Sequence, residues 1–138
     1  MLKLKNVPEE LQSAIDEKGY DKLTSVQSLV LDPSNSGKDL LVSSQTGSGK
    51  TLAYGLSISC DGLEEIIDKD NKLKTLIVTP TRELALQVFN ELAWLFSKTS
   101  ITISTAIGGM DIKKERKNIE KGVDLLIGTP GRINDHIR

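Results

Sequence analysis

The sequence predicts an α/β fold in which a mostly parallel sheet is covered by helices on both faces. Short apolar runs with the length and composition of buried strands occur at residues 39–42, 75–79, 102–107 and 124–128. Segments with helical spacing of apolar residues lie between them, and alternation of this kind gives right-handed βαβ units. Ligands in such sheets collect at the carboxyl ends of the strands. The residues that follow each run are therefore the first candidates for function.

A phosphate-binding loop, rather than an ordinary glycine–serine loop, is predicted after the first of these runs. Residues 43–51, Ser-Ser-Gln-Thr-Gly-Ser-Gly-Lys-Thr, lead into a helical segment. Glycines let the main chain approach a ligand closely, and the N–H groups at a helix N-terminus bind anions. We expect Lys50 to reach the β- and γ-phosphates of a nucleoside triphosphate and the Thr51 hydroxyl to bind Mg²⁺. The residues expected to hold the phosphates are Thr46, Gly47, Ser48, Gly49, Lys50 and Thr51.

The composition is that of a soluble globular protein. Charged residues make up 27% and hydrophobic residues 38% of the sequence, and no apolar run is long enough to span a bilayer. The single cysteine, Cys60, excludes an internal disulfide and suits a reducing cytoplasm. The formal net charge of −1 excludes a broadly cationic surface, so we expect any nucleic acid to be held by a few placed contacts. We therefore expect a cytoplasmic protein that does not bind a membrane.

The predicted helices have recognisable first and last residues. Pro8 suits the first position of a helix, and Gly19 suits its end. Another helix is expected to begin at Pro80-Thr81-Arg82-Glu83, and the last one at Thr129-Pro130, with the threonine as its N-cap. Residues 111–121 mix lysine and arginine with glutamate, which predicts a helix whose charged side chains face solvent.

The tetrapeptide Thr24-Ser25-Val26-Gln27 has two interpretations. Its spacing fits a capping box, in which the Gln27 side chain bonds back to the Thr24 backbone N–H. Alternatively, the Gln27 amide pairs with N6 and N7 of an adenine, because an amide offers both a donor and an acceptor. Spacing alone favours the cap.

Taken together, these motifs resemble the first RecA-like domain of the DEAD-box ATP-dependent RNA helicases. The matching segments, in family order, are Gly19-Tyr20 with residues 24–27 (the adenine-reading Q motif), 43–51 (motif I), 80–85 (motif Ia), Gly108-Gly109 (motif Ib) and 129–132 (the next RNA-contacting motif). The order and approximate spacing match those of the family over essentially the whole chain. The resemblance therefore implies a RecA-like P-loop fold.

The resemblance also implies ligands and partners. It favours the adenine contact for Gln27, with Tyr20 packing against the base of ATP and with Mg²⁺ at the phosphates. The residues implied to contact RNA are Pro80, Thr81, Arg82, Gly108, Gly109, Thr129, Pro130, Gly131 and Arg132. For Arg82 the alternative is a structural ion pair with Glu83 or another neighbour. The expected partners are single-stranded or locally duplex RNA and a second RecA-like domain of the same protein.

The chain departs from the family pattern in several places. Leu23 stands where the family usually has proline, Leu2 where it has an upstream aromatic residue, and Ser44 where motif I usually has glycine or alanine. The chain ends at Arg138, before any Asp-Glu-Ala-Asp segment. We therefore expect residues 1–138 to be a first RecA-like domain truncated before that motif, inactive alone, from a parent ATP-dependent RNA helicase. The alternatives are a non-catalytic nucleotide- or RNA-binding module and a P-loop enzyme of another class.

Overall fold

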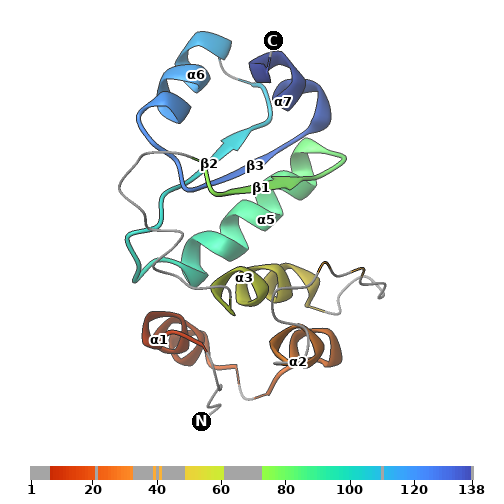
Figure 1. Ribbon diagram of the computed structural model, residues 1–138, viewed down its shortest axis with the longest axis vertical. Coiled ribbons are helices and arrows are strands. Elements are labelled where there is room, and N and C mark those ends of the chain that lie inside the picture. The colour runs from red at the N-terminus through yellow and green to blue at the C-terminus, as the bar shows by residue number, and fades with distance from the viewer. Residues whose placement is uncertain are drawn as a thin grey trace. The chain divides into compact units, whose positions relative to one another are not determined.

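The computed structural model describes residues 7–20, 22–32, 39, 41, 49–60, 73–109 and 111–137. The helices are α1 (Glu9–Lys18), α2 (Ser25–Leu31), α3 (Lys50–Cys60), α5 (Arg82–Leu95), α6 (Ile112–Glu120) and α7 (Pro130–Ile137), and the strands are β1 (Thr75–Val78), β2 (Ile103–Ala106) and β3 (Leu125–Gly128) (Figure 1). The chain divides into two compact units, Met1–Glu65 with Trp94–Thr99 and Ile66–Ala93 with Ser100–Arg138. Within the described ranges, no helix has the length and apolar character needed to cross a membrane.

Helices α1, α2 and α3 belong to the first unit. α1 ends at Gly19, as predicted, because this residue adopts a left-handed φ of 78° that suits glycine. Pro8, by contrast, is the N-cap of α1 and not its first helical residue. Its carbonyl accepts the N–H groups of Leu11 and Gln12, so it starts the helix without needing an N–H of its own. The buried apolar residues of this unit are Leu11, Ala14, Ile15, Val30, Leu52, Ala53, Leu56, Leu95 and Phe96.

The second unit contains a three-stranded parallel sheet in the order β1-β3-β2. Gly128 pairs with both Val78 and Ala106, so the three strands end level with one another. α5 lies on one side of this sheet, and α6 and α7 lie on the other (Figure 1). On the α6 and α7 side, Ile119 and Ile133 pack against the buried cluster of Ala106, Val123 and Leu126. The loops that leave the strands therefore share one edge of the sheet.

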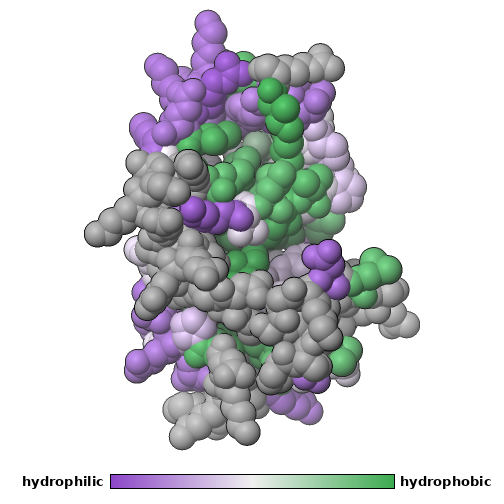
Figure 2. All heavy atoms as spheres, viewed as in Figure 1, coloured by the Kyte–Doolittle hydropathy of each residue, from purple (hydrophilic) through white to green (hydrophobic). Residues whose placement is uncertain are grey.

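Three of the predicted strands are confirmed, each slightly shorter than its apolar run. The exception is the run at residues 39–42, of which the structure describes Asp39 and Leu41. Both lie outside any strand, and Leu41 is fully exposed. The prediction of a fully buried strand is also wrong for β1, where Leu76 and Val78 are 45% and 54% exposed. β1 is an edge strand of the described sheet, and Figure 2 shows hydrophobic side chains at the surface over this part of the molecule.

Helix α6 is charged, as predicted, but one of its charged residues faces the protein interior. Its lysine and arginine side chains are exposed, and Figure 2 shows hydrophilic residues gathered over this helix. Glu115 is only 2% exposed, so the prediction of a solvated charged face is wrong at this position. The physical reason is helical spacing, because Glu115 lies on the same side of α6 as the partly buried Ile112 and Ile119.

Thr102 and Asp124 tie together the amino end of the sheet. The Thr102 N–H donates to Asp124 Oδ2 at 2.9 Å, and the Asp124 N–H donates to the Thr102 hydroxyl at 3.0 Å. These bonds join the residues that enter β2 and β3. Side chains at this end therefore serve pairing of the strands, and the candidate ligand-binding loops lie at the opposite end.

Candidate functional site

Gln27 closes the capping box that its spacing predicts. The Thr24 N–H donates to Gln27 Oε1 at 2.9 Å, and the Thr24 hydroxyl accepts the Gln27 N–H at 3.4 Å. The other end of the amide, Nε2, donates to the Gly49 carbonyl at 3.2 Å. Gln27 is 5% exposed, so both ends of its amide are engaged within the first unit. The capping interpretation is confirmed, whereas contact with an adenine stays a prediction.

Gly49 is the last glycine of the phosphate-loop sequence and has a backbone conformation that favours glycine. Its φ is 84°, and a Cβ at this position would collide with Gln27 Nε2 and lie 3.2 Å from the Thr24 side chain. α3 begins at the next residue, so Lys50 and Thr51 form its first turn. An ammonium, a hydroxyl and helix N–H groups are the donor set that fits nucleotide phosphates and Mg²⁺. The other predicted phosphate contacts, Thr46, Gly47 and Ser48, lie outside the described residues.

The Tyr20 ring stacks on Trp94, with 5.9 Å between the ring centroids and 29° between the planes. The Lys18 ammonium lies 5.2 Å from the Trp94 centroid, within the range of a cation–π interaction. Tyr20 remains 42% exposed, so part of the ring is accessible to a ligand. Its packing against a base stays a prediction.

The other predicted loops follow strands that end side by side. One further backbone hydrogen bond extends each strand pair. The Thr79 N–H donates to the Gly128 carbonyl at 2.9 Å and extends the pair of β1 and β3. The Thr129 N–H donates to the Ala106 carbonyl at 3.1 Å and extends the pair of β2 and β3. The segments that this register places at one edge are Pro80–Arg82, Gly108-Gly109 and Thr129–Arg132. The predicted common edge is therefore confirmed for these three loops, and the phosphate loop belongs to the first unit.

Arg82 lies against the backbone of Gly109. Gly108 and Gly109 have φ values of 82° and 81°, and a Cβ on Gly109 would collide with Arg82 Nη2, whereas one on Gly108 would meet nothing within 4 Å. Arg82 is exposed and, among the described residues, forms no ion pair. The alternative of a structural pair with Glu83 is therefore not found. The segments that contain Arg82 and Gly109 meet at this contact.

Two threonines start the helices at this edge. The Thr81 hydroxyl accepts the Leu84 N–H at 3.2 Å, so Thr81 caps α5. The Thr129 carbonyl accepts the Ile133 N–H at 3.0 Å, and α7 begins at Pro130 as predicted. Both helix N-termini therefore open at the edge, where their N–H groups and dipoles favour an anion.

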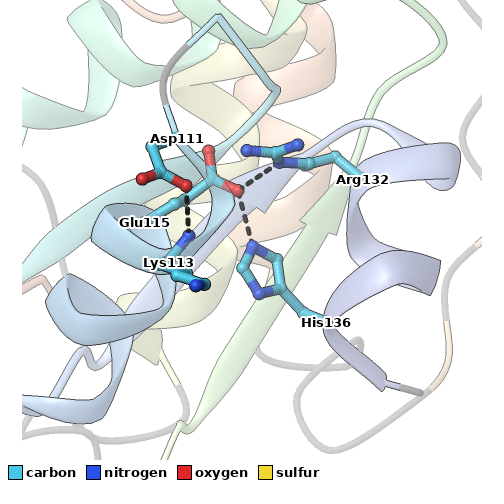
Figure 3. A network of polar contacts seen from close by, with 5 residues as sticks. All are labelled: Asp111, Lys113, Glu115, Arg132 and His136. Atoms are coloured by element: carbon cyan, nitrogen blue, oxygen red, sulfur yellow. Dashed lines mark hydrogen bonds and ion pairs between the residues drawn. The ribbon is translucent and has the colours of Figure 1, made fainter.

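Arg132 is held by a carboxylate that the sequence analysis did not single out. Its Nε lies 2.7 Å from Glu115 Oε1, and His136 Nε2 lies 2.5 Å from the same oxygen (Figure 3). The Glu115, Arg132 and His136 side chains are 3%, 17% and 12% exposed. Arg132 and His136 are four residues apart on α7 and so share one face of that helix. One carboxylate oxygen thus joins α6 to α7.

The environment of Glu115 keeps this buried carboxyl ionised near neutral pH. Burial alone would raise its pKa, but the hydrogen bonds from His136 and Arg132, together with their charges, outweigh burial and lower the pKa of Glu115 below its ordinary value. An ionised carboxylate only accepts hydrogen bonds. His136 must therefore carry a proton on Nε2, and Glu115 compensates the charge of Arg132 inside the protein.

The interacting residues missed by the sequence analysis are Trp94, Glu115 and His136. The inward position of Glu115 had a signal, since it lies between two isoleucines at helical spacing. Nothing in the sequence shows which residue on a second helix it meets. In the described part of the chain, no group of three or more histidine, cysteine, aspartate or glutamate residues is arranged to hold a metal ion.

A family model for DEAD/DEAH box helicases matches residues 24–138. The ATP-dependent RNA helicase HAS1 of Chaetomium globosum is 42% identical over 134 residues, which cover 96% of this chain and 23% of that protein. The ATP-dependent RNA helicase RhlB of Pasteurella multocida is 41% identical over 130 residues, which cover 94% of this chain and 31% of that protein. The chain thus spans about a quarter to a third of the length of these curated relatives.

Two solved structures share the fold. A hypothetical ATP-dependent RNA helicase from Sulfolobus tokodaii matches with a TM-score of 0.78 and 35% identity over 94% of this chain and 36% of that one. The RNA helicase Prp28 from Chaetomium thermophilum, bound to ADP, matches with a TM-score of 0.79 and 30% identity over 95% of this chain and 32% of that one. The predicted RecA-like α/β fold is confirmed. The chain belongs to the DEAD/DEAH box helicase family.

Proposed function

We propose that the protein is an ATP-dependent RNA helicase, in which ATP binding and hydrolysis are coupled to binding of single-stranded RNA and local unwinding of duplexes. The observation that carries the proposal is the bond from Gln27 to Gly49. It joins the candidate adenine-reading residue to the last glycine of the phosphate loop, directly before Lys50 and Thr51. The named relatives, which are ATP-dependent RNA helicases, support the same activity.

The first unit would bind ATP. Lys50 would contact the β- and γ-phosphates, the Thr51 hydroxyl would hold Mg²⁺, and Gln27 and Tyr20 would contact the adenine. The bound ion would supply charge neutralisation on the phosphates. Because the Gln27 side chain donates to the carbonyl of Gly49, an adenine bound at Gln27 would be linked through one hydrogen bond to the residue that precedes Lys50.

The second unit would bind RNA at the carboxyl edge of its sheet. Arg82 and Arg132 supply positive charge there, and the N-termini of α5 and α7 supply oriented N–H groups. Contacts of this kind bind phosphates without reading the base sequence. We further propose that the chain is part of a first RecA-like domain, and that a second such domain of the whole protein completes the RNA-binding surface and the catalytic site.

The proposal is tested by measuring phosphate release from ATP by the full-length protein, with and without single-stranded RNA. We expect RNA to stimulate hydrolysis and Lys50→Ala to lower kcat about a hundredfold, because a donor to the reacting phosphates is lost. Lys98→Ala is the matched control, since Lys98 pairs at the surface with Glu17 and its loss should leave the wild-type rate unchanged. A Lys50→Ala protein with the wild-type rate would contradict the proposal.

A further inference from the structure

Glu115 is placed to control how Arg132 is presented at the edge of the sheet. Its carboxylate is buried, ionised and aimed at α7, where one oxygen accepts hydrogen bonds from both Arg132 Nε and His136 Nε2 (Figure 3). Arg132 belongs to the first turn of α7, directly after the loop that leaves β3. The same side chain is thus fixed from within the protein and located where the RNA backbone is expected.

We propose that Glu115 is a positioning residue that orients the Arg132 guanidinium toward a phosphate of single-stranded RNA, with His136 holding the same carboxylate oxygen in place. This inference rests on the proposed function, which assigns an RNA phosphate to Arg132. Arginine usually contacts a phosphate with its planar fork of N–H groups. The bond to Glu115 is made through Nε, which fixes the plane of the guanidinium.

Orientation is the expected benefit because a free arginine side chain loses rotamer freedom when it binds. A guanidinium that is already held loses less, and the complex gains affinity without a new contact. His136 contributes by occupying the same Glu115 oxygen from a position one turn further along α7. Together the two donors restrict the carboxylate to a single place between the helices.

Two other roles for Glu115 predict different results. If its charge mainly neutralises Arg132, removal of that charge will strengthen RNA binding. If it only ties α6 to α7, its removal will lower stability and act on RNA affinity independently of Arg132. The positioning role alone predicts weaker RNA binding that depends on the presence of Arg132.

The experiment measures the affinity of the full-length protein for a fluorescein-labelled oligouridylate in the presence of a non-hydrolysable ATP analogue. The variants are Glu115→Gln, Arg132→Ala and the double substitution. Glu120→Gln is the matched control, because it removes the same charge from an exposed position of the same helix. Thermal unfolding and binding of the ATP analogue show that each variant is folded.

We expect Arg132→Ala to weaken RNA binding about tenfold, as the loss of one charge-assisted hydrogen bond does. It should also make the dependence of log affinity on log salt shallower by roughly 0.7. Glu115→Gln should weaken binding severalfold, and the double variant should bind no more weakly than Arg132→Ala alone. Glu120→Gln should bind as the wild type does.

The outcomes separate this inference from the proposed function. Wild-type RNA affinity in Arg132→Ala would remove the RNA contact assigned to Arg132 and, with it, the positioning role. The positioning role alone would be overturned if Arg132→Ala weakened RNA binding while Glu115→Gln left the RNA affinity unchanged or made it tighter. Additive losses of RNA affinity in the double variant would overturn it as well. If Glu115→Gln does not fold, His136→Ala is measured in its place, once alone and once combined with Arg132→Ala. We then expect His136→Ala alone to cause a smaller loss of RNA affinity, and we expect no further loss when it is combined with Arg132→Ala. Additive losses of RNA affinity would overturn the inference.

Discussion

Gln27 in the first unit and Glu115 in the second each have a buried polar side chain that links separate segments of the chain. The two side chains differ in the kind of partner that they bind. The partners of the Gln27 amide are main-chain atoms, the Thr24 N–H and the Gly49 carbonyl. The partners of Glu115 are two side chains of another helix, and the group itself is charged. The hydrogen bonds of the Gln27 amide are neutral and go to main-chain atoms, whereas those of Glu115 are charged and go to side chains.

This difference shows how each candidate site residue is fixed. Main-chain partners keep Gln27 in place for as long as α2 and Gly49 keep their conformation. Under the proposed positioning role, the orientation of Arg132 depends on an ionised Glu115. Loss of a neutral hydrogen bond typically costs about 1 kcal/mol, whereas removal of one member of a buried ion pair costs about 3–5 kcal/mol. The two clusters should therefore respond to substitution and to pH in different ways.

The largest loss of stability is expected for Glu115→Ala. This change leaves the mostly buried Arg132 and His136 side chains without their shared acceptor, so the free energy of unfolding should fall by about 3 kcal/mol. Urea denaturation of the full-length protein measures it. Glu120→Ala, an exposed change on the same helix, should stay within about 0.5 kcal/mol of wild type. Equal losses in the two variants would show that the Glu115 cluster is not a stabilising link.

A smaller loss is expected for Gly49→Ala. The new Cβ would strain a left-handed residue and also displace the Gln27 amide, at a combined cost of about 2–3 kcal/mol. Gly19→Ala is the matched control, because Gly19 has a similar positive φ but nothing within 4 Å of a Cβ, and it should cost about 1 kcal/mol. The difference between the two denaturation midpoints measures the Gln27 contact, and identical midpoints would contradict it.

Gln27→Ala should cost less again, about 1–2 kcal/mol, because it removes neutral hydrogen bonds and half of a capping box. Under the proposed function it should also reduce the preference for ATP over GTP, since the amide would no longer pair with adenine. Competition between the two nucleotides for the full-length protein measures this. A Gln27→Ala protein that keeps the wild-type preference would leave Gln27 with its capping role only.

The smallest effect is expected from pH. Because the folded-state pKa of Glu115 is lowered, the ionised form stabilises the folded state above the ordinary carboxyl pKa of about 4.3, and this contribution is lost as the pH falls through the lower folded value. The stability difference between wild type and Glu115→Gln should therefore shrink below about pH 4. The difference caused by Gln27→Ala should stay constant. A Glu115→Gln difference that grows on acidification would contradict the sign.

Local patterns in the sequence predicted most of the fold. The capping box at Thr24 and Gln27 was visible because both partners lie within one helical turn. The strands at residues 75–78, 103–106 and 125–128 were visible as apolar runs, and their common edge followed from the parallel topology. The extent of burial was not visible. The exposure of Leu76 depends on what covers the sheet, which strand composition does not encode.

Contacts between distant segments could not be predicted in the same way. Glu115 and Arg132 are 17 residues apart, and their pairing depends on how α6 and α7 cross the sheet. A mixture of charges on a helix ordinarily indicates a solvated face, so the tertiary position of one glutamate overrode the pattern. The stacking of Tyr20 on Trp94 has the same origin, since the two residues lie in separate sequence segments of the first unit.

Under the proposed function, nucleotide and RNA bind to the same protein in a coupled way. The most direct test is the affinity of the full-length protein for single-stranded RNA, measured once with a non-hydrolysable ATP analogue and once with ADP. We predict clearly tighter RNA binding with the ATP analogue, and loss of this difference in Lys50→Ala. Equal RNA affinity with both nucleotides in the wild-type protein would contradict ATP-dependent RNA binding.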